Sequence, residues 1–394
     1  MADPAEHSFY DEPGLSYSIE KPMTDWDGKR KEWLRQHPSY IQGLHDRILM
    51  ITGSQPSPCK NQIGDHLLLR LFKNKVDYCR IHGCDVFYND ALLHPKMTGY
   101  WAKYAIIRAA MLAHPEVEWI WWVDSDALIT DMEFRLPLDR YRAYNLVVPG
   151  WPNLVFGAKK KSWTSINAGI FLIRNCQWSM DFLHQWAGAG PQTPEYENWG
   201  NILRSAFEDK LYPDSDDQSA LLYLILKHQG STFGNKIRIE SEYTLHGYWL
   251  GIVGELDNLT DSYRDMEKWV PGLRRRHAEA VSEYYGSERE KHRRMKASKK
   301  KREGGEGGHD RKPFITHFTG CSPCSGEHNP LYKGEQCWEG MVKALNFADN
   351  QVLRNYGFMR RDLRNTSEVS EVAFDYPADE DVWGEEMTTL TPPK

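Results

Sequence analysis

Short apolar runs alternate with amphipathic stretches along the first third of the chain. The run Arg47–Gly53 is apolar and stops at a glycine, and Cys84–Asn89 has a similar character, so both are predicted to be buried strands. Between them, the spacing of the apolar residues predicts a helix that begins at Asp65. Its buried face should carry the residues that recur three or four positions apart: Leu68, Phe72, Val76 and Cys79. A second helix is predicted over Trp101–His114, and a third strand in the aromatic-rich run that follows it.

The second half of the chain keeps this alternation. Strands are predicted over Asn145–Gly150, Asn167–Asn175 and Pro313–Phe318. Helices are predicted over Gln177–Trp186, Asp217–Lys227 and Cys337–Gly357. Strands that alternate with helices of this length predict an α/β fold with a mostly parallel, Rossmann-like central sheet covered by helices on both faces. In such sheets, ligands bind beyond the carboxyl ends of the strands.

Composition divides the chain into three segments. Residues 1–45 are polar and contain prolines, which predicts an irregular arm on the surface. Residues 46–361 hold the alternating pattern, interrupted at about 272–312 by a charged helical insertion that runs into glycine-rich sequence. Residues 362–394 are acidic and are predicted to form a flexible tail. No apolar run reaches the roughly 20 residues that cross a bilayer, and the N-terminus lacks the pattern of a signal peptide.

Charge and composition narrow the class of function. The net charge of -6 argues against nucleic acid as a partner, because affinity for a phosphate backbone comes mainly from clustered Lys and Arg. The chain has no Gly-rich phosphate loop of the G-x-x-x-x-G-K-S/T type, which argues against phosphoryl transfer. Its 15 Trp, 20 Tyr and 14 Phe residues suit the binding of flat sugar faces, although core packing uses the same rings.

The cysteines and sequons bear on the cellular compartment. Cys321 and Cys324 form a C-x-x-C pair, but no second pair completes a zinc site. A structural disulfide that involves Cys337 is therefore predicted. Two Asn-x-Ser/Thr sequons, at Asn258 and Asn365, favour a lumenal location.

Two aspartates interrupt the most apolar stretch of the sequence, "EWIWWVDSDALIT". Successive side chains of a strand point to opposite faces, so Asp124 and Asp126 should share one side while Ser125 points to the other. Two converging carboxylates repel each other unless a cation lies between them. Their oxygens suit Mg²⁺ or Mn²⁺, which bridge to the phosphates of nucleotides. A pair of solvated loop acids is the simpler alternative, and the position after a buried strand favours the metal site.

The motifs "WWVDSDA", "INAGIFLIRNCQWSMDFL", "DSDDQSALLYLI", "FITHFTGC" and "ALNFADNQVLRNYGF" together resemble the plant glycosyltransferases of family 34. The resemblance runs from about Tyr10 to Arg361. "GPQTPEYENWGNILR" and "GLRRRHAEAVSEYYG" are more similar to the galactomannan galactosyltransferase branch than to the xyloglucan xylosyltransferases. The resemblance implies a GT-A fold, a nucleotide-sugar donor, Mn²⁺ dependence and retention of anomeric configuration. It also implies a type II Golgi membrane protein with a lumenal catalytic domain, whose N-terminal membrane anchor is absent from this chain.

The resemblance also implies roles for individual residues. The metal site should be formed by Asp124, Asp126 and His317, with Asp126 binding the metal directly and Asp124 contacting the metal or the ribose. The catalytic loop should supply Asp217, Asp216 and Gln218. Donor-binding residues should be Gly53, Ser54, Lys103, Ser125, Asn167, Ala168, Gly169 and Ser322. Two further assignments come from the residues themselves. The "HGYW" segment places rings beside a histidine on a predicted loop, so His246, Gly247, Tyr248 and Trp249 are candidates for the acceptor groove. Arg108, five positions after Lys103 on the same predicted helix, is a further candidate for the donor diphosphate.

Several of these residues also have simpler interpretations. His317 could be a core histidine, and Asp216 could cap the helix that begins at Asp217. The "HGYW" segment could be aromatic core packing. Asp217 should lie beside the anomeric carbon, either as a transient nucleophile or as a stabiliser of an oxocarbenium ion. Ser322 stands where the xylosyltransferase branch usually carries a lysine, which puts a phosphate contact at that position in doubt.

The sequence thus favours a retaining galactosyltransferase that moves galactose from UDP-galactose, in α-1,6 linkage, onto a β-1,4-mannan chain. The same machinery acting with UDP-xylose on a β-1,4-glucan is the alternative enzyme. An inactive Golgi scaffold subunit is the alternative of another class. A homodimer, or a complex with a mannan synthase, is the expected assembly.

Overall fold

The computed structural model describes residues 18–210, 212–269, 291 and 312–372. Its central sheet has six strands in the order β2-β1-β3-β6-β5-β7. In chain order these strands are β1 (Ile48–Gly53), β2 (Asp85–Asn89), β3 (Trp119–Val123), β5 (Leu146–Pro149), β6 (Ile170–Arg174) and β7 (Ile237–Glu240). Within this sheet β6 alone is antiparallel to its neighbours, β3 and β5. The predicted mostly parallel sheet is confirmed, and β6 departs from it because the chain returns from β5 without a crossover helix.

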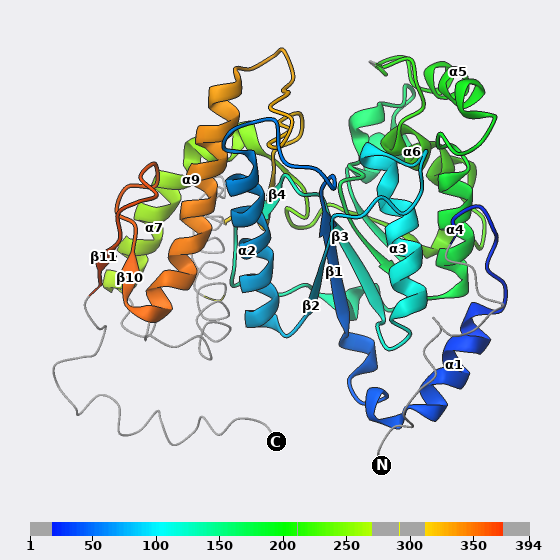
Figure 1. Cartoon of the computed structure of the whole chain (residues 1–394), viewed down its shortest axis with the longest axis horizontal. Coiled ribbons are helices and arrows are strands. Elements are labelled where there is room, and N and C mark those ends of the chain that lie inside the picture. The colour runs from blue at the N-terminus through cyan, green and yellow to red at the C-terminus, as the bar shows by residue number, and fades with distance from the viewer. Residues whose placement is uncertain (1–17, 211, 270–290, 292–311, 373–394) are drawn as a thin grey trace, which may run out of the picture.

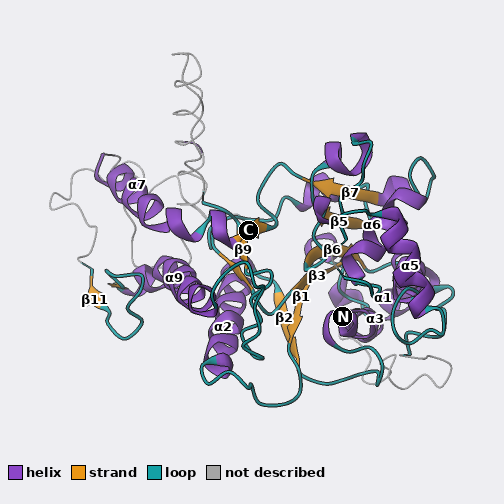
Figure 2. Ribbon diagram, turned by 90° about the horizontal axis from the view of Figure 1, so that it is seen from above, coloured by secondary structure: helices purple, strands orange, loops and turns teal. Residues whose placement is uncertain are grey.

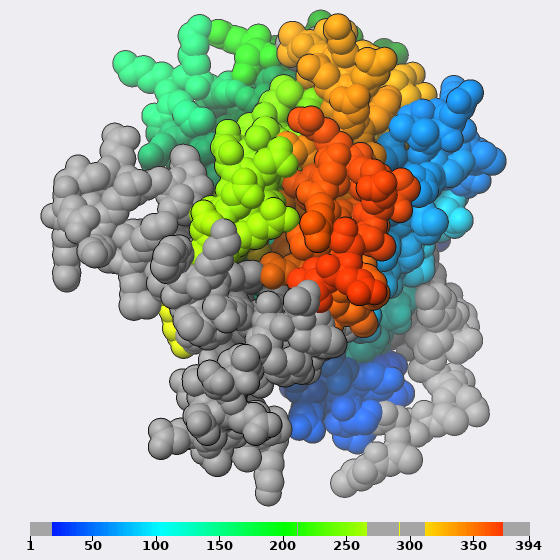
Figure 3. Space-filling model, turned by 90° about the vertical axis from the view of Figure 1, so that its left-hand side faces the viewer, coloured from blue at the N-terminus to red at the C-terminus, as the bar shows by residue number. Residues whose placement is uncertain are grey.

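Helices cover both faces of this sheet (Figure 1). One face carries α1 (Trp26–Gln36), α3 (Ala102–Ala113), α4 (Gln177–Ala187) and α6 (Asp217–Lys227), with α5 (Tyr196–Ala206) packed on α6. The other face carries α2 (Gly64–His82) and α9 (Gly334–Leu353), with α7 (Leu256–Trp269) beside α9. Figure 3 shows α7 in yellow-green alongside the orange and red C-terminal segment. The expected α/β architecture, a mostly parallel sheet with helices on both faces, is confirmed.

A second, small sheet lies beside the main one (Figure 2). It has the order β4-β9-β8, formed by Ala127–Ile129, Ile315–His317 and Gly247–Tyr248. Because β4 starts four residues after β3 ends, the chain passes from the main sheet into the small sheet through Asp124–Asp126. This junction joins the two sheets at the carboxyl end of β3.

The strand β3 explains why so apolar a stretch precedes the aspartates. Ile120 and Trp122 pack in the core under α3 and α4, whereas Trp119, Trp121 and Val123 pack in the core under α2 and α9. All five residues are buried, as a central strand covered on both faces requires. The buried face of α2, the helix predicted to begin at Asp65, differs from the predicted face, because Phe72 and Val76 are only partly buried. The buried stripe of α2 includes Leu67, Leu71, Asn74, Lys75 and Tyr78.

The segments outside the predicted pattern are more regular than expected where the structure describes them. The arm contains α1, whose Trp26 is fully buried and donates from its indole nitrogen to Asn175 Oδ1 at 2.7 Å. After residue 361, Leu363 is buried and a short antiparallel pair joins β10 (Phe358–Met359) to β11 (Ser370–Glu371). Most of the predicted insertion at 272–312 lies outside the described residues. No helix in the described part of the chain is long and apolar enough to span a membrane.

The structure contains three disulfides, and two of them fasten the segment that follows the small-sheet strand β9. Cys321 pairs with Cys337, which confirms the predicted disulfide at Cys337, and Cys79 pairs with Cys84. The third disulfide joins Cys59, before α2, to Cys324, 265 residues later. It therefore ties the loop after β1 to the segment that follows His317. Cys176 is free.

Replacing Cys59 and Cys324 together by serine should lower the free energy of unfolding by about 2–4 kcal/mol, because the long loop closed in the unfolded chain is released. Thermal and denaturant unfolding, compared with the wild type, measure this change. Cys176→Ser is the matched control and should cost less than about 1 kcal/mol. Equal Tm values for the double variant and the control would contradict a stabilising role for the Cys59–Cys324 bond.

Candidate functional site

The two aspartates of the apolar stretch lie in a turn rather than in a strand. β3 ends at Val123, and Ala127 N donates to Asp124 O at 3.1 Å to close the turn into β4. Asp124 N donates to Gly169 O at 2.8 Å, which anchors the turn to β6. The expected alternation of faces along a strand was therefore the wrong reason for their convergence. The turn and the pairing of β4 with β9 bring the carboxylates together instead.

Asp124, Asp126 and His317 form a cluster that can hold a metal ion. Register pairing places His317 of β9 opposite Ala127, next to Asp126. The imidazole Nε2 lies 3.2 Å from Asp126 Oδ1 and 4.0 Å from Asp124 Oδ2, and ligand atoms of all three residues lie within 4.8 Å of one another. The carboxylates are 28% and 20% exposed, so a cation could reach them from solvent. Two carboxylates and one imidazole suit a divalent cation such as Mn²⁺ or Mg²⁺.

Gly169 leaves the space that this cluster needs. A Cβ atom at this position would lie 2.4 Å from His317 Cε1 and 2.5 Å from Asp124 Oδ2. Both distances are far below van der Waals contact, so any side chain here would push on two of the three ligands. The glycine of the "NAG" motif is thus explained by close approach to the candidate metal site.

Lys103 connects the metal cluster to the predicted catalytic aspartate. Its ammonium lies 2.8 Å from Asp217 Oδ2 and 3.5 Å from Asp124 Oδ1, and it donates to Ala168 O at 2.9 Å. The side chain is 2% exposed. Burial disfavours the charged form of Lys103, but the carboxylates of Asp124 and Asp217 outweigh burial and raise its pKa. Lys103 is therefore a fixed buried cation between two carboxylates.

Asp217 is a buried carboxylate at the first turn of α6. Burial raises its pKa to about 6, although Lys103 acts in the opposite direction. It remains mostly ionised at pH 7. Tyr104 donates from its hydroxyl to Asp217 Oδ2 at 3.4 Å, and Trp186 donates from its indole nitrogen to the backbone oxygen of Asp217 at 2.8 Å. A reactive carboxylate held in one geometry is what either predicted role of Asp217 requires.

The neighbours of Asp217 make different contacts. Asp216 accepts from Ser219 N at 2.8 Å and pairs with Lys210 Nζ at 2.9 Å, so it acts as the N-cap of α6. Gln218 accepts from Ala168 N at 3.2 Å and from Asn167 Nδ2 at 3.3 Å. The structure therefore links Gln218, but not Asp216, to the "NAG" segment.

Most of the remaining predicted donor residues lie either in the "NAG" segment or at the end of β1. Asn167, Ala168 and Gly169 lie beside Asp124 and Lys103, and Asn167 Oδ1 accepts from Gly169 N at 2.9 Å. Gly53 and Ser54 lie at the end of β1, where Ser54 Oγ is 2.7 Å from Tyr88 OH.

Ser54 and Tyr88 line an open cavity of about 400 Å³ at that end of β1. Ser125 lies in the aspartate turn, Ser322 is exposed, and Arg108 is 1% exposed within α3.

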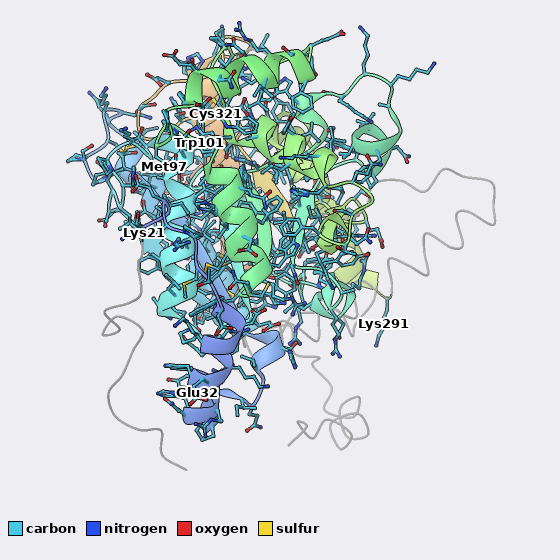
Figure 4. All side chains as sticks on the ribbon, turned by 90° about the vertical axis from the view of Figure 1, so that its right-hand side faces the viewer. Lys21, Glu32, Met97, Trp101, Lys291 and Cys321 are labelled. Atoms are coloured by element: carbon cyan, nitrogen blue, oxygen red, sulfur yellow. A yellow bond between two sulfur atoms is a disulfide. The ribbon has the colours of Figure 1, made fainter. Side chains whose placement is uncertain are left out.

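A larger cleft of about 810 Å³ opens next to Asn167 and Gln218. Gly320, which lines the cleft, precedes Cys321, and Figure 4 shows Cys321 and Trp101 at the end of the molecule opposite Glu32 of α1. Among the predicted acceptor residues, His246 and Tyr248 line the cleft, and Tyr248 is 45% exposed. Burial lowers the pKa of His246 to about 3, and the nearby His317 adds to the effect. His246 is therefore neutral at pH 7.

The prediction that Trp249 lines the acceptor groove was wrong. Its ring is 3% exposed and stacks on Phe318 with centroids 5.4 Å apart, because it follows Tyr248 on the opposite, core-facing side. Gly247 is also buried, and a Cβ there would lie 2.6 Å from Ile315 O. Five aromatic residues of the cleft were not predicted from the sequence: Trp151, Trp163, Tyr212, Tyr243 and Tyr332. Trp151 is 53% exposed, unlike the core tryptophans, but its position in the sequence does not show this difference.

Comparison with known proteins gives both the class and the family of the chain: it is a glycosyltransferase. Residues 45–328 match the model of the galactosyl transferase GMA12/MNN10 family, glycosyltransferase family 34, and the chain belongs to this family. The resemblance found in the sequence is thus confirmed.

Three relatives illustrate its place in the family. Glycosyltransferase 6 of Arabidopsis thaliana is 60% identical, over 95% of this chain and 85% of the relative. Galactomannan galactosyltransferase 1 of Cyamopsis tetragonoloba is 59% identical, over 95% and 83%. Probable xyloglucan 6-xylosyltransferase 5 of A. thaliana is 44% identical, over 89% and 67%.

Gly169→Ala should weaken the binding of Mn²⁺ at least tenfold, because the added Cβ displaces His317 and Asp124 from the cluster. Isothermal titration of the purified protein with Mn²⁺ measures this change. Gly254→Ala is the matched control, since a Cβ at Gly254 meets no atom within 4 Å. Equal affinities of Gly169→Ala and the wild type would show that the cation binds elsewhere.

Proposed function

We propose that the protein is a retaining galactosyltransferase that moves galactose from UDP-galactose, in α-1,6 linkage, onto a β-1,4-linked mannan chain. The 59% identity to a galactomannan galactosyltransferase carries this choice, compared with 44% to a probable xyloglucan xylosyltransferase. The arrangement of Asp124, Lys103 and Asp217 supports the transfer chemistry, because it brings a metal-binding carboxylate and a reactive carboxylate to the same buried ammonium.

The charges of the site fit the needs of sugar transfer. Breaking the anomeric C–O bond of a UDP-sugar places negative charge on the leaving diphosphate. A divalent cation, for which we propose Mn²⁺, supplies Lewis-acid stabilisation of that charge when bound by Asp124, Asp126 and His317. Lys103 holds Asp217 ionised and oriented next to the same place. Asp217 then stabilises the positive charge that develops on the anomeric carbon, either through space or by forming a transient bond.

The cleft supports a polysaccharide acceptor. A β-1,4-linked chain presents flat apolar ring faces, and aromatic side chains stack on such faces. Tyr248 and Trp151 are both large and exposed within the cleft, and Trp163, Tyr212 and Tyr332 line its walls. Asn329 adds a polar group for binding sugar hydroxyls. The proposed acceptor site therefore extends well beyond the "HGYW" segment.

The runner-up is transfer of xylose from UDP-xylose to a β-1,4-glucan. The two donors differ by the hydroxymethyl group at C6, so discrimination depends on space around the donor sugar. The family relationship also underlies the proposed setting: a lumenal Golgi domain held by an N-terminal anchor, acting as a homodimer or with a mannan synthase. Asn258 of the first sequon is exposed on α7 and accessible to glycosylation.

The direct test is to incubate the purified protein with Mn²⁺ and mannohexaose, supply UDP-galactose or UDP-xylose, and measure product masses. The proposal predicts the addition of one or more hexoses from UDP-galactose and no addition of pentose from UDP-xylose. Linkage analysis of the product should give α-1,6-galactose. Cellohexaose in place of mannohexaose is the matched acceptor control.

Pentose transfer to cellohexaose without hexose transfer to mannohexaose would contradict the proposal and favour the xylosyltransferase. Silence with every donor and acceptor pair would favour a scaffold subunit. In that case, measuring Mn²⁺-dependent binding of UDP separates the possibilities, because a scaffold has no need of a nucleotide site.

A further inference from the structure

Trp122 contacts Asp124 of the candidate metal-binding cluster but is not itself a ligand of that cluster. It is 5% exposed and occupies β3, two residues before Asp124. Its ring packs in the core under α3 and α4 together with Ile120. Its indole N–H and one face of its ring make polar contacts.

Both of these polar contacts are with residues of the site. The indole Nε1 donates to Asp124 Oδ1 at 2.5 Å. The ammonium of Lys103 lies 5.7 Å from the ring centroid of Trp122 and 3.5 Å from the same Asp124 Oδ1. Trp122 therefore contacts both the first carboxylate of the cluster and the buried cation next to it.

The two oxygens of Asp124 consequently have different surroundings. Oδ1 is held by the indole N–H and faced by Lys103. Oδ2 faces the other ligands, 4.0 Å from His317 Nε2 and above Gly169, where a Cβ would lie only 2.5 Å away. An indole N–H stabilises the ionised carboxylate without adding a full positive charge, so it orients the ligand and does not repel a cation.

We propose that Trp122 is a positioning residue of the metal site, which fixes Asp124 Oδ1 by its indole N–H and thereby directs Oδ2 toward the cation. The inference rests on the metal site assigned above. Hydrogen-bond partners of metal ligands commonly change metal affinity or activity by about 10–100-fold when they are lost. The tryptophan of "WWVDSDA" then has a function that a phenylalanine of similar shape would not supply.

The neighbouring Trp121 provides a matched control. It is fully buried on the opposite face of β3, stacked on Phe314 with centroids 5.9 Å apart. Its indole Nε1 has no hydrogen-bond partner among the described residues. Changing either tryptophan to phenylalanine removes the same atoms from the same strand, but only Trp122→Phe removes a hydrogen bond to a metal ligand.

The test is direct binding of Mn²⁺ to the whole chain without donor or acceptor, measured by the electron paramagnetic resonance signal of free Mn²⁺. Trp122→Phe should weaken binding at least about tenfold. Trp121→Phe should change it by no more than about twofold. In transfer assays, raising the Mn²⁺ concentration should restore the kcat of Trp122→Phe, because Asp217 and Lys103 remain in place.

Unchanged Mn²⁺ affinity in Trp122→Phe, or equal losses in both variants, would overturn the inference. If Trp122→Phe does not fold, a benzothienylalanine at position 122 replaces the indole N–H by sulfur and keeps the ring shape. The same tenfold weakening is expected, and an unchanged affinity would again overturn the inference. A wild-type protein that binds no Mn²⁺ would instead overturn the metal assignment itself.

Discussion

The candidate site depends on the ion pairs that the buried Lys103 ammonium makes with two carboxylates. The ammonium lies between Asp217 and Asp124 and also binds the backbone oxygen of Ala168. Without this cation, the carboxylates of Asp124 and Asp217 would repel each other with no counter-charge between them. Lys103 supplies a counter-charge to both carboxylates, and it opposes the effect of burial, which raises the pKa of Asp217. The positive charge of Lys103 therefore serves both the proposed metal site, through Asp124, and the proposed reactive carboxylate of Asp217.

The fold brings this cation to its partners from three directions. α3 carries Lys103 across one face of the sheet, β3 ends at the aspartate turn, and α6 presents Asp217 at its first turn. The small sheet then adds His317 through the pairing of β9 with β4. The Cys59–Cys324 and Cys321–Cys337 disulfides fasten the chain just beyond His317. Residues more than 200 positions apart in the sequence therefore meet at the carboxyl end of β3.

Most of the strands, helices and candidate site residues could be predicted from the sequence. Some of these predictions, however, rested on a physical reason that the structure does not bear out. Hydrophobic spacing predicted β1, β3 and α6 because strong local patterns form these elements. The convergence of Asp124 and Asp126 was predicted by strand alternation, whereas a turn produces it. His317 could be assigned only through family resemblance, since nothing local distinguishes a ligand from a core histidine. The placement of Trp249 failed because the same aromatic residue types occur in grooves and in cores, and the turn that begins after β8 packs this ring on Phe318.

The most direct test of the account is a double-mutant cycle on the free energy of unfolding with Lys103→Met, Asp217→Asn and the two changes combined. Each single change leaves a buried polar partner without its counter-charge and should cost about 3–5 kcal/mol. The account predicts that the double variant loses less than the sum of the two single losses, with a coupling free energy of about 1–3 kcal/mol. Losses that add within about 0.5 kcal/mol would contradict the claim that the Lys103–Asp217 pair organises the site.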